Sequence, residues 1–300
     1  MNRGIWSALG AYTIWGFIPI YLKWLNQVPA LQIVGHRIIW SCLMLCAFLL
    51  VTSQWRKFMA KAWHVRIVAT YFIAAVLLSI NWLIYVWAVN SDFIVEASLG
   101  YFINPLISVV FGVVLLREKL RSWQWLAVGL ALAGVLYLTW AHGSLPWIAL
   151  GLAITFALYG LIKKTAQLGA LHGLTLETGI LLLPGLAYLL YAESGPQGAF
   201  SHGGFVVDIL LIGCGLVTAT PLLLFAWAAQ RIPLALLGLL QYIGPTLQFL
   251  VGVLVYGEPF TSDKFVGFGL VWAALLIFAI EGVLARPGKL VQAGEGAAGT

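Results

Sequence analysis

Apolar stretches of about 20 residues follow one another along almost the whole chain, and no other feature of the sequence constrains the fold so strongly. As an α-helix, a stretch of that length crosses the hydrocarbon core of a bilayer. The stretches lie near residues 4–22, 31–52, 67–89, 94–116, 123–141, 145–162, 173–191, 207–230, 234–256 and 265–284. The composition agrees, because 62% of the residues are hydrophobic and only 9% are charged, too few to cover a soluble domain. We therefore predict an all-α integral membrane protein with ten transmembrane helices.

The basic residues are distributed unevenly between the loops that these ten helices would leave on the two sides. With the N-terminus in the cytoplasm, the cytoplasmic side carries Arg3, Arg56, Lys57, Lys61, Arg66, Arg117, Lys119, Arg121, Lys163, Lys164, Arg231, Arg286 and Lys289. Only Lys23 and Lys264 fall outside, and Arg37 lies within a span. Because cytoplasmic loops carry the excess of lysine and arginine, we expect both termini in the cytoplasm. The first span lacks a small-residue cleavage site after a short apolar region, so we expect it to be retained.

The second half of the sequence repeats the first at an offset of 140 residues. At this offset Pro105 falls on Pro245, Glu118 on Glu258, Gly112 on Gly252 and Gly129 on Gly269. Each half holds five of the expected spans, and because five is odd the second half enters the membrane from the opposite side. We predict two inverted five-helix repeats, 1–142 and 143–284, followed by a flexible cytoplasmic tail, 285–300. Inverted repeats are typical of secondary transporters, which bind their substrates near the midplane.

Both repeats carry a proline near the expected centre of their fourth helix, Pro105 and Pro245. A proline inside a helix removes one backbone donor and crowds the carbonyl four residues earlier, here that of Tyr101 and that of Gln241. In lipid such a carbonyl is tolerated only where it faces protein or a wet cavity. We therefore expect helix breaks at both prolines and a substrate site between them. The alternative is a kink that only eases packing.

Several motifs resemble those of a known family. They are His36-Arg37-Ile-Ile-Trp40, Asn81-Trp82, Trp87-Ala-Val-Asn90, Glu96-Ala-Ser-Leu-Gly-Tyr-Phe-Ile-Asn-Pro105 and Gln241-Tyr-Ile-Gly-Pro245. With these strings the chain resembles the RarD proteins of bacteria, in the EamA family of the drug/metabolite transporter superfamily. The resemblance implies ten helices around a central cavity that opens alternately to each side, in a bacterial inner membrane, and the role of an exporter or permease. It does not fix a substrate, and one departure is Arg117, where the second repeat has Gly257.

Four ionisable residues lie deep inside the expected spans: His36, Arg37, Glu96 and Glu177. A charge in a span costs about 2.5–3.5 kcal/mol on insertion scales, so each is a candidate functional residue. Arg37 and Glu177 coincide at the 140-residue offset but should lie at different depths, so we expect separate charges. We hypothesise an Arg37–Glu96 pair in the outer half of the cavity, with snorkelling of Arg37 to the headgroups as the alternative.

Two of these four residues leave alternatives open. Glu177 is expected either to pair with Lys163 or Lys164 or to carry protons. His36 either titrates during transport or makes one structural hydrogen bond.

The remaining candidate substrate-binding residues are aromatic and amide side chains inside the expected helices. They are Trp15, Asn81, Trp82, Asn90, Tyr101, Asn104, Tyr159, Gln241, Tyr242 and Gln248. Because the polar end of a Tyr or Trp needs a partner in apolar surroundings, we expect an aromatic, hydrogen-bonding pocket for a small amphipathic organic molecule. Glu118 and Glu258 end their spans at opposite faces. They are candidate gating residues, or charges that bond the start of the next helix.

These patterns favour a secondary transporter over other classes of protein. The sequence has no HExxH, no GxSxG turn and no Walker lysine loop, and its three cysteines show neither disulfide nor zinc spacing. We expect no enzyme activity, no cofactor, no metal site and no nucleic-acid partner. The expected partners are a small organic substrate, the lipid bilayer and protons as a candidate coupling ion, and we expect a monomer. A channel or a lipid scramblase is the alternative that remains open.

Overall fold

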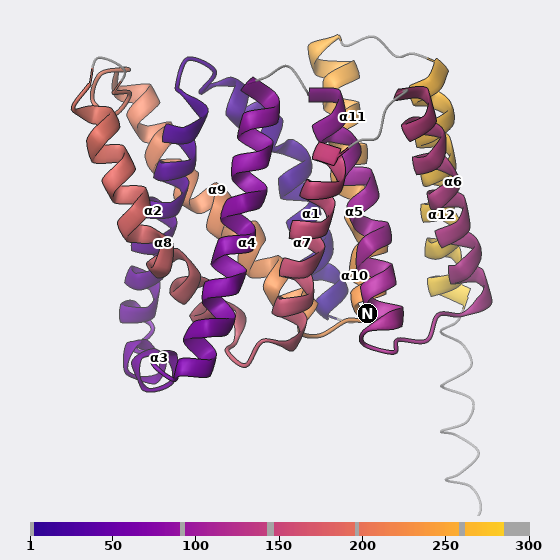
Figure 1. Ribbon diagram of the computed structural model, residues 1–300, viewed down its shortest axis with the longest axis horizontal. Coiled ribbons are helices and arrows are strands. Elements are labelled where there is room, and N and C mark those ends of the chain that lie inside the picture. The colour runs from indigo at the N-terminus through magenta and orange to yellow at the C-terminus, as the bar shows by residue number, and fades with distance from the viewer. Residues whose placement is uncertain (1–2, 91–93, 143–146, 196–197, 258–261, 285–300) are drawn as a thin grey trace, which may run out of the picture.

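The chain folds into a bundle of α-helices (Figure 1). The structure, a computed structural model, describes the backbone of residues 3–90, 94–142, 147–195, 198–257 and 262–284, and the side chains of these residues except 86, 89–90, 94–99, 141–142, 262–264 and 282–284. The helices are α1 (Arg3–Lys23), α2 (Ala30–Val51), α3 (Trp55–Ala62), α4 (Val65–Asn90), α5 (Ile94–Val114), α6 (Ser122–His142), α7 (Trp147–Thr165), α8 (Ala170–Glu193), α9 (Phe205–Ala229), α10 (Leu234–Gln241), α11 (Ile243–Tyr256) and α12 (Ser262–Leu284). The described residues form no strand, so the fold there is all-α.

The long helices follow the apolar stretches of the sequence closely. Eight helical segments within the described residues are long and apolar enough to cross a membrane: α1, α2, α4 as far as Tyr85, α6 as far as Trp140, α7, α8, α9 and the pair α10–α11. The other two expected spans are also helical, as α5 and α12. Their apolar parts with described side chains are shorter, Gly100–Val114 and Phe265–Glu281.

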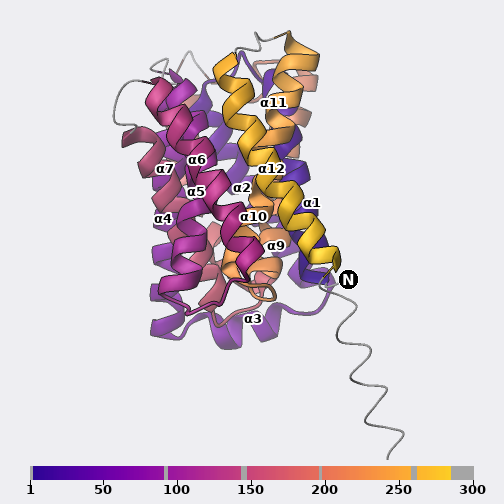
Figure 2. The ribbon, with the colours of Figure 1, turned by 90° about the vertical axis from the view of Figure 1, so that its right-hand side faces the viewer.

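The sequence analysis did not predict α3, a short amphipathic helix between α2 and α4. Its apolar side chains Phe58 and Ala62 are buried against Leu49 of α2, whereas its basic residues Arg56 and Lys57 are exposed. Figure 1 places α3 at the end of the bundle where α1 begins, and in Figure 2 α12 ends on this same side. The basic face of α3 therefore lies with the two ends of the described chain.

The two prolines that were expected to break helices behave differently. In the second half the chain does break, because α10 ends at Gln241 and α11 begins at Ile243, two residues before Pro245. In the first half the expected break is absent, since α5 continues through Pro105 as one helix. The two helices pack closely at this level, because a Cβ added to Gly238 of α10 would come within 2.8 Å of the Pro105 carbonyl oxygen. This contact involves both helices and does not explain why only one of them is interrupted.

The helices of the first half pack mainly against helices of the second half. α5 contacts α7 and α10; α4 contacts α7 and α8; α2 contacts α8 and α9; α1 contacts α9, α10 and α11; and α6 contacts α12. Figure 1 shows α2 and α8 together at one end of the bundle and α6 and α12 together at the other. The space between these outer pairs is filled by α1, α4, α5, α7, α9 and α10, and the candidate site residues project from these helices and from α2 and α8.

Candidate functional site

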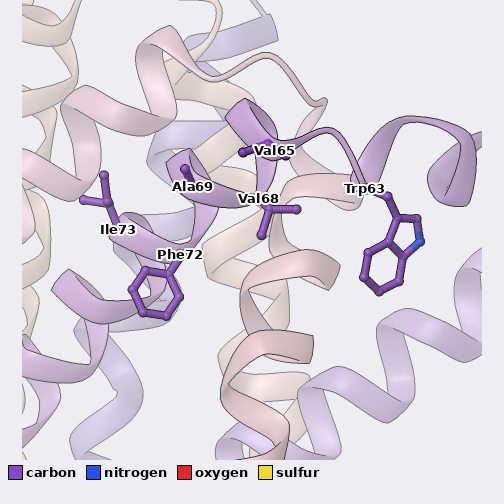
Figure 3. Close-up of a pocket in the computed structure, with 6 residues that line it drawn as sticks. All are labelled: Trp63, Val65, Val68, Ala69, Phe72 and Ile73. Carbon is purple, nitrogen blue, oxygen red and sulfur yellow. The ribbon is translucent and has the colours of Figure 1, made fainter.

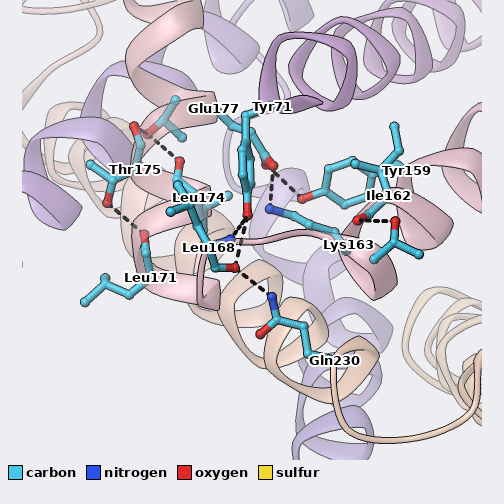
Figure 4. Close-up of polar contacts among 12 residues, drawn as sticks. Tyr71, Tyr159, Ile162, Lys163, Leu168, Leu171, Leu174, Thr175, Glu177 and Gln230 are labelled. Carbon is cyan, nitrogen blue, oxygen red and sulfur yellow. Dashed lines mark hydrogen bonds and ion pairs between the residues drawn. The ribbon is translucent and has the colours of Figure 1, made fainter. Parts of the chain in front are cut away.

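A buried ion pair joins α7 to α8 (Figure 4). Lys163 Nζ lies 2.5 Å from Glu177 Oε1, and both side chains are 1% exposed. Tyr159 donates from its hydroxyl to Glu177 Oε2 at 3.1 Å. Tyr159 and Lys163 are four residues apart and so share one face of α7, which the short turn before α8 brings against Glu177. Each charge would be costly to bury alone, so the pair depends on this local geometry.

Tyr71 of α4 connects this ion pair to the first half of the chain. Its hydroxyl donates to the carbonyl of Leu168 at 3.0 Å and accepts from the Leu168 N–H at 3.1 Å. Lys163 Nζ lies 5.3 Å from the centre of the Tyr71 ring, a cation–π distance. Gly173 makes this approach possible, because a Cβ there would come within 2.5 Å of the Tyr71 ring. We call Tyr71, Tyr159, Lys163 and Glu177 the Glu177 group.

The Glu177 group answers a question that the sequence left open. Of the two partners proposed for Glu177, Lys163 is the one that binds it, whereas Lys164 Nζ donates to the Ile232 carbonyl at 2.5 Å. Lys163, which was expected on the cytoplasmic side, is buried. Burial is possible because the ammonium has both a carboxylate and two aromatic rings around it.

A second polar group surrounds Arg37 of α2. Arg37 Nε donates to Thr218 Oγ1 of α9 at 2.8 Å, and the guanidinium carbon lies 4.7 Å from the ring centre of Trp82 of α4. Tyr85 and Tyr101 lie in the neighbourhood of Arg37, and their rings contact each other with centroids 6.0 Å apart. We call Arg37, Trp82, Tyr85, Tyr101 and Thr218 the Arg37 group. Arg37 thus turns into the bundle, which does not support snorkelling to headgroups.

A small cavity of about 10 Å³ adjoins Arg37 between α1, α2 and α9. Its lining consists of Ile18, Tyr21, Leu22, Arg37, Cys214, Val217 and Thr218. This volume is close to the minimum that holds one water molecule. The region beside the guanidinium is therefore nearly closed in this conformation.

His36 is buried and faces away from the Arg37 group. Its Nδ1 accepts from Trp40 Nε1 at 3.2 Å, its ring lies 5.3 Å from that of Phe200, and its Nε2 has no hydrogen-bond partner among the described residues. This agrees with the structural hydrogen bond that was one of the two alternatives for His36.

The side chains of four expected pocket residues instead donate hydrogen bonds to backbone carbonyls of other helices. Asn81 Nδ2 donates to the Leu152 carbonyl at 2.9 Å and to Thr155 Oγ1 at 3.0 Å. Asn104 Nδ2 donates to the Ala153 carbonyl at 2.8 Å, and its buried Oδ1 has no hydrogen-bond partner in the part of the chain that the structure describes.

The other two are on the interrupted helix. Tyr242 donates to the Phe102 carbonyl at 3.1 Å, and Gln248 Nε2 to the Trp15 carbonyl at 3.0 Å. Such bonds hold helices together in lipid, so in this conformation these side chains connect the bundle and do not line one common pocket.

Two further expected residues lie in the interior without joining either group. Trp15 packs its ring against Tyr12, Phe156 and Phe225, with centroids 5.7 Å away in each case. Gln241 is buried at the end of α10. The side chains of Asn90 and Glu96, and the whole of Glu258, lie outside the described residues. The Arg37–Glu96 pair therefore stays a prediction.

Glu118 binds the start of a helix, although not the next one along the chain. Its carboxylate accepts from the Leu234 N–H at 2.6 Å and from the Ala235 N–H at 2.8 Å, at the first two residues of α10. A carboxylate is favourable there because the first N–H groups of a helix lack partners within it. Gly112 provides the space, since a Cβ at that residue would lie 2.5 Å from Glu118 Oε2. Glu118 therefore bonds the start of a helix, as in the alternative to a gating role, but the helix is α10 and not the next one along the chain.

The start of α4 and the turn before it border a hollow with a mostly apolar lining (Figure 3). Trp63, Val65, Val68, Ala69, Phe72 and Ile73 line it. The indole nitrogen of Trp63 is the one polar side-chain atom among these residues. The polar groups of the interior are therefore the stronger candidates for a substrate site.

Comparisons with known proteins identify the family. Residues 2–140 match the EamA-like transporter family. The chain is 45% identical over 286 residues to the uncharacterized transporter YojE of Bacillus subtilis (strain 168), covering 94% of this chain and 95% of YojE. It is 44% identical over 285 residues to the protein RarD of Escherichia coli (strain K12), with 94% and 95% covered. The chain belongs to the RarD-type EamA transporters.

A solved crystal structure shares the fold of this RarD-type chain. It covers 92% of this chain and 97% of its own, with a TM-score of 0.70 at 18% sequence identity. At that identity the likeness establishes the fold alone. Together with the apolar helices and the bacterial relatives, the family membership identifies a multi-pass transporter of the bacterial inner membrane.

Lys163, Tyr71, Tyr85 and Thr218 were not predicted as site residues. For Lys163 a usable signal existed, because it lies one helical turn from Tyr159, which was predicted, and close in sequence to Glu177. Tyr71, Tyr85 and Thr218 carried no such signal, because they meet their partners only through packing between distant helices.

Proposed function

We propose that this chain is a secondary transporter of a small organic molecule that works by alternating access, with ten membrane spans arranged as two inverted repeats, 1–142 and 143–284. In this proposal α1, α2, α4, α5 and α6 correspond to α7, α8, α9, α10–α11 and α12. Both termini are cytoplasmic, as the distribution of basic residues favours.

The contacts between the long helices of the two repeats carry the proposal, because these contacts are the same when the repeats are exchanged. The contact of α5 with α7 corresponds to the contacts of α1 with α10 and α11. The contact of α4 with α7 corresponds to that of α1 with α9, and the contact of α4 with α8 corresponds to that of α2 with α9. The pairs α2–α8, α5–α10 and α6–α12 are each their own counterparts. A two-fold axis in the membrane plane would produce this pattern.

The turn after the fourth span of each repeat supports the same correspondence. Arg117 has φ 55° and Gly257 has φ 66°, and the two residues are 140 apart. The Glu118 N–H donates to the Gly112 carbonyl, and the Gly257 N–H donates to the Gly252 carbonyl. Both repeats thus close this helix with a left-handed residue and a bond to the equivalent glycine.

The transport path that we propose runs between the Arg37 group and the Glu177 group. Two links between the repeats close its cytoplasmic end in this conformation: Tyr71 with Leu168, and Glu118 with the start of α10. The interruption at Tyr242 supplies a flexible point between α10 and α11, of the kind found at transporter substrate sites. Rocking of the repeats would break these links and open the path inward.

Protons are the coupling ion that we propose. Glu177 is the one carboxylate among the described side chains that is fully buried, and ionisable residues inside a membrane mark proton and ion pathways. Protonation of Glu177 would release Lys163 from the ion pair and weaken the contact of Lys163 with Tyr71.

Counterflow in liposomes tests the proposed function. Purified protein is reconstituted with amino acids, nucleobases, aromatic acids or amphenicols inside, and uptake of the same labelled compound is followed. A transporter gives saturable uptake that the internal compound stimulates and that rises when a pH gradient is imposed. Uptake that is linear in concentration and indifferent to internal solute would indicate a channel, and movement of labelled phospholipid would indicate a scramblase. Either result contradicts the proposal.

A further inference from the structure

Arg37 carries a charge that no described acidic side chain neutralises. The described side chains form three ion pairs within 4.0 Å: Arg121 with Glu281, Lys163 with Glu177, and His202 with Glu193. Arg37 is partly buried and is not among them. A cation held inside a membrane protein is costly and usually marks a functional contact.

The guanidinium is fixed so that one of its edges is available. Nε is engaged by Thr218 at 2.8 Å, and one face is covered by Trp82 at 4.7 Å. No described residue is bonded to Nη1 or Nη2, which carry the other N–H donors of the side chain. An arginine edge of this kind matches the two oxygens of a carboxylate in a bidentate contact.

The surroundings of Arg37 suit an organic acid better than a phosphate. A phosphate dianion would need a second cation, and Lys163, the one fully buried lysine or arginine among the described residues, is already paired with Glu177. Aromatic rings lie near the guanidinium on two sides, Trp82 of α4 and Tyr21 of α1. A carboxylate with an aromatic or apolar body would satisfy both features.

We propose that Arg37 binds the carboxylate of the transported molecule, and that the substrates are monocarboxylic acids with an aromatic or apolar body. This inference rests on the proposed transport function and narrows its substrate class. The cavity beside Arg37 has room for about one water molecule. The acid therefore enters when α1 or α9 moves away from α2, and the structure represents a closed conformation.

The test compares each acid with its uncharged amide. Thermal unfolding of the purified protein in detergent is measured with benzoate and phenylacetate, and with benzamide and phenylacetamide. The acids should raise the melting temperature in a saturable manner, and the amides should not. Arg37→Gln should abolish the shift, and Arg37→Lys, which keeps the charge but loses the planar fork, should weaken binding at least tenfold. Thr218→Val removes only the hydrogen bond that holds Arg37 Nε, so it should weaken acid binding less than Arg37→Gln does. This variant provides the test if Arg37→Gln does not fold.

A matched control is available just after the end of α9. Arg231 stacks on Trp227 with 3.6 Å between the guanidinium carbon and the ring centre, and it is exposed. Arg231→Gln therefore removes the same chemical group beside the same kind of ring and should leave the acid-dependent shift unchanged.

Several results would overturn the carboxylate assignment. They are equal shifts from acid and amide, an acid shift that survives Arg37→Gln, the absence of any acid shift in the wild type, and an acid shift that appears only in Glu96→Gln. The last result would mean that Glu96 occupies the guanidinium. The counterflow assay distinguishes this failure from failure of the transport proposal. Saturable exchange of neutral solutes would support transport and contradict the role of Arg37. Acid binding that depends on Arg37, without counterflow, would support the binding site and contradict transport.

Discussion

Replacing Glu177 by glutamine would leave the Lys163 ammonium buried beside a neutral partner. At the observed separation of 2.5 Å, the two charges attract by roughly 6–7 kcal/mol at an effective dielectric constant of 20. Most of this attraction offsets the loss of hydration, which is not recovered when one partner is removed. We therefore expect Glu177→Gln to lower the free energy of unfolding by about 3–5 kcal/mol, and Lys163→Met to have an effect of similar size.

The double variant Lys163→Met with Glu177→Gln should regain most of this loss, because no buried charge is left unpaired. Its free energy of unfolding should lie within about 2 kcal/mol of the wild type. Denaturant unfolding in mixed micelles, followed by circular dichroism, measures all three variants. Glu281→Gln is the control, since its partner Arg121 is 60% exposed and such pairs contribute at most about 1 kcal/mol. A loss below about 1 kcal/mol for Glu177→Gln, or additive losses in the double variant, would refute the reasoning.

Three further substitutions have effects that follow from the geometry, and the same unfolding assay measures each. Glu118→Ala should cost about 1–3 kcal/mol, because two N–H groups at the start of α10 lose their acceptor; an unchanged stability would show that water replaces the carboxylate. Arg117→Gly should stabilise by up to about 1 kcal/mol by relieving the left-handed backbone at φ 55°, and a loss would mean that the arginine side chain itself contributes. Tyr242→Phe should cost about 0.5–1.5 kcal/mol for its bond to the Phe102 carbonyl, against no change for Tyr191→Phe, which is exposed.

The expected spans were predictable because the length of an apolar stretch is fixed by the thickness of the bilayer. The start and end of α7 and α8 agree with their apolar stretches within a few residues. α3 was missed because eight amphipathic residues in a basic loop do not resemble a span. The continuity of α5 at Pro105 was missed because the sequence places a proline at the same position of both repeats, and only one of the two helices is interrupted.

The candidate site was predictable in its residue types but not in its grouping. Arg37 and Glu177 stand out because charges in apolar helices are rare, and they are separate, as expected from their depths. Whether an amide such as Asn104 faces a cavity or a neighbouring carbonyl depends on the rotation of two helices about their axes. No local pattern in the sequence reports that rotation, and the structure shows the bond to Ala153.

The central claim is that the two ends of the path open in opposition, and the labelling rates of two cysteines test it most directly. The native Cys214 is buried in the cavity beside Arg37, and Leu168→Cys places a second thiol at the buried end of the path that we propose to be cytoplasmic; Cys42 and Cys46 are replaced by alanine. Tyr71→Phe then removes both bonds to Leu168 that close this end. With a membrane-impermeant maleimide, alternating access predicts faster labelling at residue 168 from the inside and slower labelling of Cys214 from the outside. If both rates rise together, or if Cys214 does not respond, the repeats do not move in opposition and the account is wrong.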